Sequence, residues 1–294
     1  MSRFKALAEG QAWTPWLLIL PGLAFYALFV LVPIVATFAL SLFRWDGLLP
    51  PKFIGLDNFV KLVGTPGVQQ AFGVSLAFIA FSCILPVAAA LLIVGAVTRV
   101  QVRGLSIFRL LYFLPYTLAL AVVAIAWRWL YANDGIVAMV VNLVFGDGSY
   151  KPLLGDFDFA LPALGIVAMW TTFGFVVVLL LAGAQHIPKD LYDAARVDGA
   201  GPVREFFAVT VPGLRYELGV ALTMTTIFAL RMFDLPLMAT GGGPGYATTT
   251  PSLMMYRNVF TDGAVGYGSG IAVLLTIVTF VAVPVIGRLP GGKE

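Results

Sequence analysis

Long apolar stretches alternate with short polar segments along almost the whole chain. Because lipid offers no hydrogen bonds to the backbone, each stretch that is long enough to cross a bilayer is expected to form an α-helix. The sequence therefore predicts an all-α polytopic membrane protein with about six spans in one transmembrane domain, residues 16–286, preceded by segment 1–15 and followed by a tail, 287–294. The expected spans are residues 16–43, 74–98, 110–131, 161–184, 218–239 and 267–286.

The first apolar stretch is far longer than the core of a signal peptide and has no obvious small-residue cleavage site. We therefore expect it to remain as an uncleaved span. Pro21 and Pro33 lie inside this stretch and should bend its helix, which neighbouring helices in a bundle can tolerate.

Composition supports a membrane protein and excludes several other classes. Hydrophobic residues make up 60% of the chain and charged residues 11%, with a mean hydropathy of +0.94, whereas soluble domains carry about 25% charged residues. The net charge of +3 is not gathered into a basic patch with aromatic residues, so nucleic acid is not an expected partner. Cys83 is the single cysteine, which excludes an intrachain disulfide.

Positive charges are unevenly divided between the two predicted sides of the membrane. Six spans place both chain ends on the same side, and that side carries eleven Lys and Arg residues against five on the other. Since cytoplasmic loops are enriched in Lys and Arg, both ends and the polar segment 185–212 are predicted to be cytoplasmic. The eleven are Arg3, Lys5, Arg99, Arg103, Arg109, Lys189, Arg196, Arg204, Arg215, Arg288 and Lys293, and the five are Arg44, Lys52, Lys61, Lys151 and Arg257.

The polar segment 185–212, QHIPKDLYDAARVDGAGPVREFFAVTVP, is the longest strongly polar interruption in the chain. Pro188 suits the start of a helix, and Asp190 and Asp193 place negative charge near its N-terminal end. Gly199 supplies a stop, because glycine accepts a positive φ without strain. A second short helix is expected over residues 203–210, ended by Pro212.

The expected helix in this segment has one face that another protein could approach closely. Ala194, Ala195 and Gly199 have almost no side chain, so the backbone of the helix is accessible there. Leu191 and Tyr192 supply apolar area for anchoring. The polar rim would come from Arg196 and Asp198.

The spacing of Asp193-Ala194-Ala195, Gly199 and Val209-Thr210-Val211-Pro212 resembles the EAA signature of permease subunits from binding-protein-dependent ABC importers. The sequence departs from that signature by Asp in place of Glu and Val in place of Ile or Leu. An ordinary amphipathic loop between two spans is the alternative interpretation. In the family this segment is a cytoplasmic coupling helix that seats in a cleft of the ATPase subunit. The resemblance assigns coupling to Asp190, Leu191, Tyr192, Asp193, Ala194, Ala195, Arg196, Asp198, Gly199 and Pro212.

A second resemblance lies after the fifth span. Phe233-Asp234 followed by Thr240-Gly241-Gly242-Gly243-Pro244-Gly245 and Thr248 is similar to a segment of the carbohydrate-uptake branch, particularly its maltose-type and lactose-type first permease subunits. The glycines are not a phosphate-binding loop, because no Lys-Ser or Lys-Thr pair follows them. They are expected to form a tight external turn.

Together, the resemblances imply a type I ABC importer permease for a sugar or oligosaccharide in a bacterial or archaeal cytoplasmic (inner) membrane. The implied partners are a second homologous permease, an ATPase dimer, an extracytoplasmic solute-binding protein that can be a lipoprotein, the carbohydrate and membrane lipid. The chain has no Walker motif, so ATP and Mg would belong to the partner ATPase and no cofactor is expected on this chain. We therefore expect a transport subunit that is not itself an enzyme.

Arg231 and Asp234 are the ionisable residues that the pattern places well inside a span, where unpaired charge is costly. Three positions apart, they would share one face of a helix. Two interpretations remain open: an internal salt bridge, or a lining of the translocation route or its outer gate.

Sugar recognition calls for an aromatic face beside small polar groups, a combination found in Trp170, Thr171 and Thr172 of the fourth span. Thr225 and Asp234 are weaker candidates. A Trp and two Thr in a membrane helix are also ordinary helix-packing residues. An ion-coupled secondary transporter is the alternative function, although it would favour more intramembrane carboxylates than Asp234 alone, and a non-transporting membrane scaffold is a further one.

Overall fold

The computed structural model describes residues 14–97 and 104–288 of the chain. Five cations used in the sidedness prediction, Arg3, Lys5, Arg99, Arg103 and Lys293, lie outside these ranges. The described residues are almost entirely helical, with a single two-stranded hairpin, so the all-α expectation is confirmed.

The elements follow one another as a helical bundle with short connections. In chain order they are α2 (Thr14–Tyr26), η1 (Ala27–Leu31), α3 (Val32–Leu40), β1 (Phe43–Arg44), β2 (Lys52–Phe53), α4 (Asp57–Gly64), α5 (Pro66–Ile79), η2 (Ala80–Ile84), α6 (Leu85–Val97), α7 (Leu105–Thr117), α8 (Leu120–Leu130), α9 (Ile136–Phe145), η3 (Leu153–Gly155), α10 (Ala160–Ala184), α11 (Lys189–Val197), α12 (Pro202–Glu205), η4 (Phe206–Thr210), α13 (Val211–Gly213), α14 (Arg215–Leu230), α15 (Asp234–Thr240), α16 (Pro251–Phe260) and α17 (Val265–Gly287).

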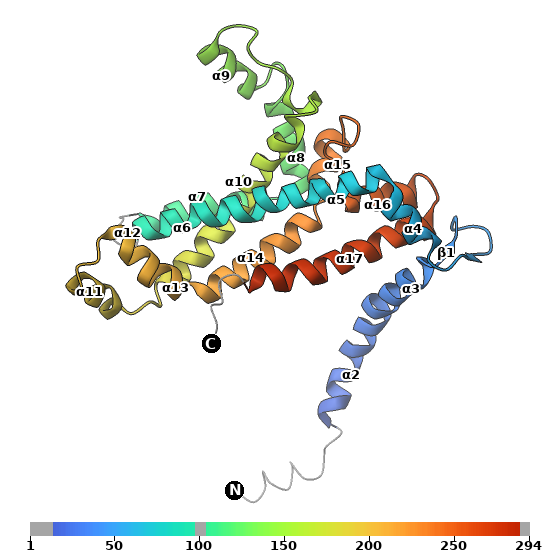
Figure 1. The fold of residues 1–294 in the computed structure, drawn as a ribbon, viewed down its shortest axis with the longest axis horizontal. Coiled ribbons are helices and arrows are strands. Elements are labelled where there is room, and N and C mark those ends of the chain that lie inside the picture. The colour runs from blue at the N-terminus through green and yellow to red at the C-terminus, as the bar shows by residue number, and fades with distance from the viewer. Residues whose placement is uncertain (1–13, 98–103, 289–294) are drawn as a thin grey trace, which may run out of the picture.

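Helix α10 is the centre of the bundle. More than half of its residues are buried, and it packs against α6, α7, α14 and the π segment η2. Two apolar clusters share it, one with α5, α8 and α14 and the other with α6 and α14. In Figure 1, α5, α6, α14 and α17 run roughly along the long axis, with α11 at one end and α4 and β1 at the other.

Two helices project from this bundle. The first membrane-length helix, Leu18–Leu40, has no buried residue, and it extends away from the body with α3 against α17 (Figure 1). Helix α9 projects at another side and also exposes most of its apolar residues. Asn58 fixes the turn after α3, because its buried amide donates to the carbonyls of Ser41 and Phe43 at 2.8 and 3.0 Å.

Four helices are long and apolar enough to cross a membrane, and the described residues contain up to six spans if each of two bent helix pairs is counted as one. The segment expected as the third span is such a pair: α7 and α8 meet at an angle of 97°. Leu118 and Ala119 between them have extended ψ values of 143° and 125°, just after Pro115. Hydropathy alone does not reveal this bend, because the apolar run continues across it.

The fifth expected span is also interrupted. Helix α14 ends at Leu230 and α15 begins at Asp234, with an angle of 44° between them. The second span begins earlier than expected, since α5 starts at Pro66, eight positions before residue 74. Residues 66–73 contain polar positions that the apolar pattern excluded, yet they continue the same helix.

Each π segment that the structure describes ends two residues before a proline: Pro33, Pro86 and Pro212. In all three, the residue before the proline donates its N–H to the carbonyl five positions earlier. A proline removes one N–H and its ring crowds the carbonyl four positions back, so a wider turn relieves both problems without ending the helix. This arrangement lets each chain segment pass a proline as continuous helix.

The contact between α10 and α7 depends on Gly174, where an added Cβ would overlap the carbonyl oxygen of Tyr112. We predict that Gly174→Ala lowers the free energy of unfolding by about 1–3 kcal/mol, because two backbones must separate to admit one methyl group. Gly73→Ala is the matched control, since no atom lies within 4 Å of the equivalent position in α5. Thermal unfolding of the purified variants in detergent measures the difference, and equal transition temperatures for the two would contradict this account.

Candidate functional site

The polar segment 185–212, which we call the coupling segment, places α11 outside the bundle. Helix α11 has no buried residue. Its apolar side chains Leu191 and Val197 are 52% and 88% exposed, and Ala194 beside them is exposed as well. Val203 and Phe207 extend this apolar surface onto α12 and η4. The segment therefore has an exposed apolar face that includes a small residue, Ala194.

The ends of α11 are defined by Pro188 and Gly199. Pro188 occupies the N-cap position, and Asp190 lies in the first turn, where the helix dipole favours a carboxylate. At the other end, Ala200 N–H donates to Ala195 C=O at 2.9 Å and Gly199 N–H donates to Arg196 C=O at 3.0 Å. This is a Schellman motif, and Gly199 has the φ of +73° that it needs. The predicted glycine stop is confirmed.

Two side chains fasten α11 to the segment that follows it. The hydroxyl of Tyr192 lies 3.2 Å from that of Thr210, and Arg196 Nε donates to Glu205 Oε2 at 3.2 Å. Arg196 also pairs with Asp193 at 3.3 Å. Tyr192 and Arg196 therefore both contact the segment that follows α11, and the side chain of Arg196 is still 54% exposed. Sequence reasoning missed Glu205 and Thr210, although a glutamate amid apolar residues was a signal that it has a partner.

The end of the coupling segment also differs from the prediction. Pro212 does not end a helix, because the π segment η4 accommodates it and the helical path continues as α13 to Gly213. Ile187 packs so closely on Gly213 that an added Cβ would meet its side chain. Ile187 and Leu214 are buried in the same apolar cluster as α10 and α14. The coupling segment is thus attached to both of its flanking helices.

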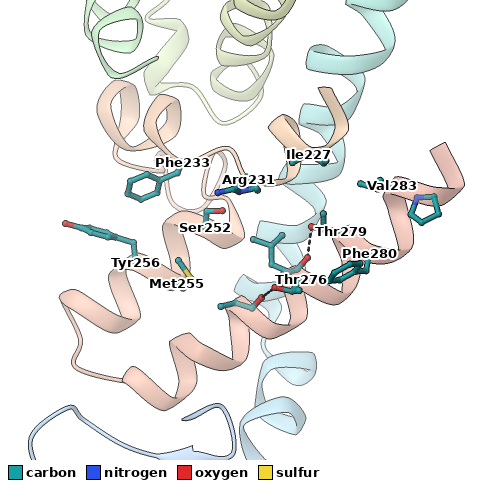
Figure 2. Close-up of a pocket in the computed structure, with 13 residues that line it drawn as sticks. Ile227, Arg231, Phe233, Ser252, Met255, Tyr256, Thr276, Thr279, Phe280 and Val283 are labelled. Carbon is teal, nitrogen blue, oxygen red and sulfur yellow. Dashed lines mark hydrogen bonds between the residues drawn. The ribbon is translucent and has the colours of Figure 1, made fainter. Parts of the chain in front are cut away.

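A second candidate site is a cavity of about 620 Å³ between the end of α14, α16 and α17. Figure 2 shows its lining, with Arg231 from the end of α14 and Thr276 and Thr279 from α17. Aromatic side chains line it as well, and Phe233 lies with its ring centroid 5.3 Å from that of Tyr256. Of the sequence candidates, Arg231 is the one that lines this cavity.

Arg231 and Asp234 do not form the expected pair. The helix breaks between them, so they do not share a continuous helical face, and the described residues contain no ion pair between them. Asp234 instead begins α15, where its negative charge interacts favourably with the positive, N-terminal end of the helix dipole. The salt-bridge interpretation is therefore wrong. Arg231 lines a cavity, which is compatible with the other interpretation, that it lines the translocation route or its outer gate.

The threonines proposed for sugar contact are buried in the bundle. Thr171 and Thr172 are 4% and 1% exposed and donate to the carbonyl of Ala168, and Thr225 donates to that of Ala221. Because all three side chains are buried among helices, these residues fit helix packing better than sugar contact. Trp170 is 39% exposed and packs edge-on against Trp127, so its ring remains partly accessible.

The interruption between α14 and α15, beside Arg231, is stabilised by Thr250. Its hydroxyl donates to the carbonyl of Met232 at 2.6 Å and also accepts from Leu253 N–H at the start of α16. The glycine turn next to it is fixed by hydrogen bonds from Thr248 to Gly243 C=O and from Thr249 to Gly242 C=O, at 2.8 and 2.9 Å. Arg257 donates to the carbonyl of Gly241 in the same turn. The turn predicted from the glycines is confirmed, and the threonines after it supply its hydrogen bonds.

Comparisons with known proteins agree with this geometry. Residues 92–288 match the family described as "Binding-protein-dependent transport system inner membrane component". The chain is 35% identical to the probable ABC transporter permease protein YurN of Bacillus subtilis (strain 168), over 90% of this chain and 91% of that protein. It is 34% identical to the trehalose/maltose transport system permease protein MalF of Thermococcus litoralis, over 91% of this chain and 89% of that protein.

A solved structure has the same fold. A chain of a bacterial ABC transporter involved in the import of the acidic polysaccharide alginate superposes with a TM-score of 0.80 at 19% identity, covering 99% of this chain and 98% of that chain. At this identity the match concerns the fold of the chain.

We predict that Thr250→Val lowers the free energy of unfolding by about 1–3 kcal/mol, because the buried carbonyl of Met232 and the N–H of Leu253 both lose a partner. The exposed Thr261, at the end of α16, provides the matched control Thr261→Val. Unfolding followed by tryptophan fluorescence measures both variants. If Thr250→Val unfolded at the same temperature as Thr261→Val, the hydrogen bond would not hold the break.

Proposed function

Because the chain belongs to the family of inner membrane components of binding-protein-dependent transport systems, we propose that it is a permease subunit of an ATP-driven importer for a carbohydrate. The relative from Thermococcus litoralis, which is named for trehalose and maltose, supports the cargo class. The chain would form half of the translocation pathway and leave ATP hydrolysis to a separate subunit.

The exposed helix α11 carries the proposal. Its exposed face would seat in the ATPase subunit, with Leu191, Ala194 and Val197 in contact with the partner. Tyr192 and Arg196 would transmit the contact inward through Thr210 and Glu205. Permeases of this family work with a second permease and a solute-binding protein, which would complete the pathway and deliver the cargo. The excess of Lys and Arg on the α11 side supports a cytoplasmic location for this helix and both termini.

The mechanism follows from the attachments of the coupling segment. When ATP draws the two ATPase subunits together, α11 moves with them. Because Ile187 and Leu214 are packed in one cluster with α10 and α14, both helices would move as well and change the access of the pathway. ATP can shift this equilibrium only if the two states differ in their contacts with the ATPase.

An ion-coupled secondary transporter is not supported by the family match, since the relatives are named as ABC or binding-protein-dependent components. Arg231 and Asp234 are not paired as an intramembrane ion relay would favour, and the expected pair is divided by the helix break.

We predict that Ala194→Trp uncouples ATP hydrolysis from uptake, because an indole on the exposed face of α11 prevents close seating in the ATPase. Uptake in proteoliposomes that contain the whole importer should fall by at least about tenfold, which corresponds to about 1.4 kcal/mol of lost contact energy. The purified permease should unfold at an unchanged temperature, since Ala194 is exposed in this chain.

The control is Ala194→Ser, which keeps the face small and should transport normally. Copurification of the ATPase with each variant separates a loss of docking from a loss of expression. Normal uptake by Ala194→Trp in a fully assembled importer would contradict the docking role.

A further inference from the structure

We infer that the cargo of this permease carries an acidic group, a carboxylate, sulfonate or phosphate, which Arg231 binds in the cavity between α14, α16 and α17. This inference rests on the proposed function as a carbohydrate importer and narrows its substrate class. It starts from a cation that has no partner within the described residues.

Among the residues that line this cavity, Arg231 is the one with a permanent charge, and none is Asp or Glu. Most of the other lining side chains are apolar, among them Ile227, Leu275 and Phe280. The side chain of Arg231 is exposed in this chain, so its guanidinium is accessible to an anion that enters the cavity, and no carboxylate of the lining competes for it. The cavity therefore has the electrostatic character of an anion site.

Within the described residues, the side chain of Arg231 has neither an ion pair nor a hydrogen bond to another side chain or carbonyl. An unpaired charge at membrane depth is costly, and such residues usually face a water-filled path or a ligand. Three other arginines have partners within the described residues: Arg196 binds Glu205, Arg215 binds the hydroxyl of Tyr216, and Arg257 binds the carbonyl of Gly241. Arg231 is thus available to a group that enters the cavity.

The remaining polar groups of the cavity suit the rest of a sugar or polyol. Thr276 and Thr279 donate to carbonyls of α17 at 2.8 Å, which leaves their oxygens free to accept from cargo hydroxyls. Ser252 lines the opposite wall on α16, and the ring of Tyr256 offers an aromatic face near it (Figure 2). A volume of about 620 Å³ admits a sugar of one or two rings.

The backbone around Arg231 is fixed, so the charge is presented at a defined place. Arg231 is the C-cap of α14, and its N–H donates to the carbonyl of Ile227 at 3.1 Å. The next residue, Met232, is 2% exposed and its carbonyl is held by Thr250. In a purely structural alternative, the positive charge of Arg231 only interacts favourably with the negative, C-terminal end of the α14 dipole. That role would influence stability without distinguishing acidic from neutral cargo.

The test begins with the cargo. Cells that express the whole importer, and cells that lack this chain, are given a pool of neutral sugars, each paired with its acid: glucose with glucuronate, galactose with galacturonate, and maltose and cellobiose with maltobionate and cellobionate. The pool also contains glycerol and glycerol phosphate. Mass spectrometry then measures which compounds are removed from the medium only when the chain is present. Removal of an acid in preference to its neutral counterpart supports the inference.

The second step is the variant Arg231→Gln, which keeps length and polarity but removes the charge. Uptake of the preferred acid should fall at least about tenfold, the loss expected for one charge-assisted hydrogen bond, with a raised KM. The preference for the acid over its neutral counterpart should shrink by the same factor. Arg231→Lys should retain an intermediate preference, because it keeps the charge without the planar fork.

Arg128→Gln is the matched control, because Arg128 is an exposed arginine in α8 that does not line the cavity. It should change neither uptake nor preference. Removal of neutral sugars alone would overturn the acidic cargo while leaving the carbohydrate importer intact, and so would an equal loss for acid and neutral cargo in Arg231→Gln. Removal of no compound would count against the proposed function itself.

Discussion

The bundle depends on keeping its backbone hydrogen-bonded wherever a helix is interrupted inside the membrane. Lipid supplies no donors or acceptors, so each break requires a local replacement. At Pro33 and Pro86 the replacement is a π turn, which continues the helix past the proline, and a π turn does the same before Pro212 in the polar coupling segment. At residues 231–233 it is a side chain, because Thr250 donates to the carbonyl that the break exposes.

These local substitutes for regular helical hydrogen bonds determine where the two candidate sites lie. The break between α14 and α15 ends a helix next to a cavity, so that Arg231 projects from a C-terminal cap instead of from a continuous helix face. The π turn before Pro212 lets the chain run from α12 into α14 without a loose loop. As a result, the coupling segment is held at one end by Ile187 and at the other by Leu214, both within one apolar cluster.

The proposed coupling role requires such an attachment. An exposed helix with apolar side chains can bind a partner, but it transmits motion only if it is fastened to the elements that must move. Tyr192 and Arg196 provide the fastening through Thr210 and the nearly buried Glu205. The outward face of the same helix remains available to a partner.

The sequence predicted the helical class, the short helix of the polar segment with its glycine stop, and the glycine turn, because these follow from hydropathy and from backbone rules that act over a few residues. It did not predict the 97° bend between α7 and α8 or the break at Arg231, since each bent pair is still apolar enough as a whole to resemble one span. The partners of Tyr192 and Arg196 were missed because they lie eighteen and nine positions away. Thr171 and Thr172 looked suitable for a sugar because composition does not show which helix face is buried.

The central claim, that α11 docks on an ATPase subunit, is tested most directly by a photo-crosslinking amino acid at Leu191, an exposed apolar residue on α11. The importer is irradiated intact in its native membrane, and the crosslinked product is identified by mass spectrometry. The account predicts a crosslink to the ATPase subunit whose yield changes when ATP is added. A Leu191 that crosslinks only to lipid or to an extracytoplasmic protein, with the ATPase present in the complex, would contradict it.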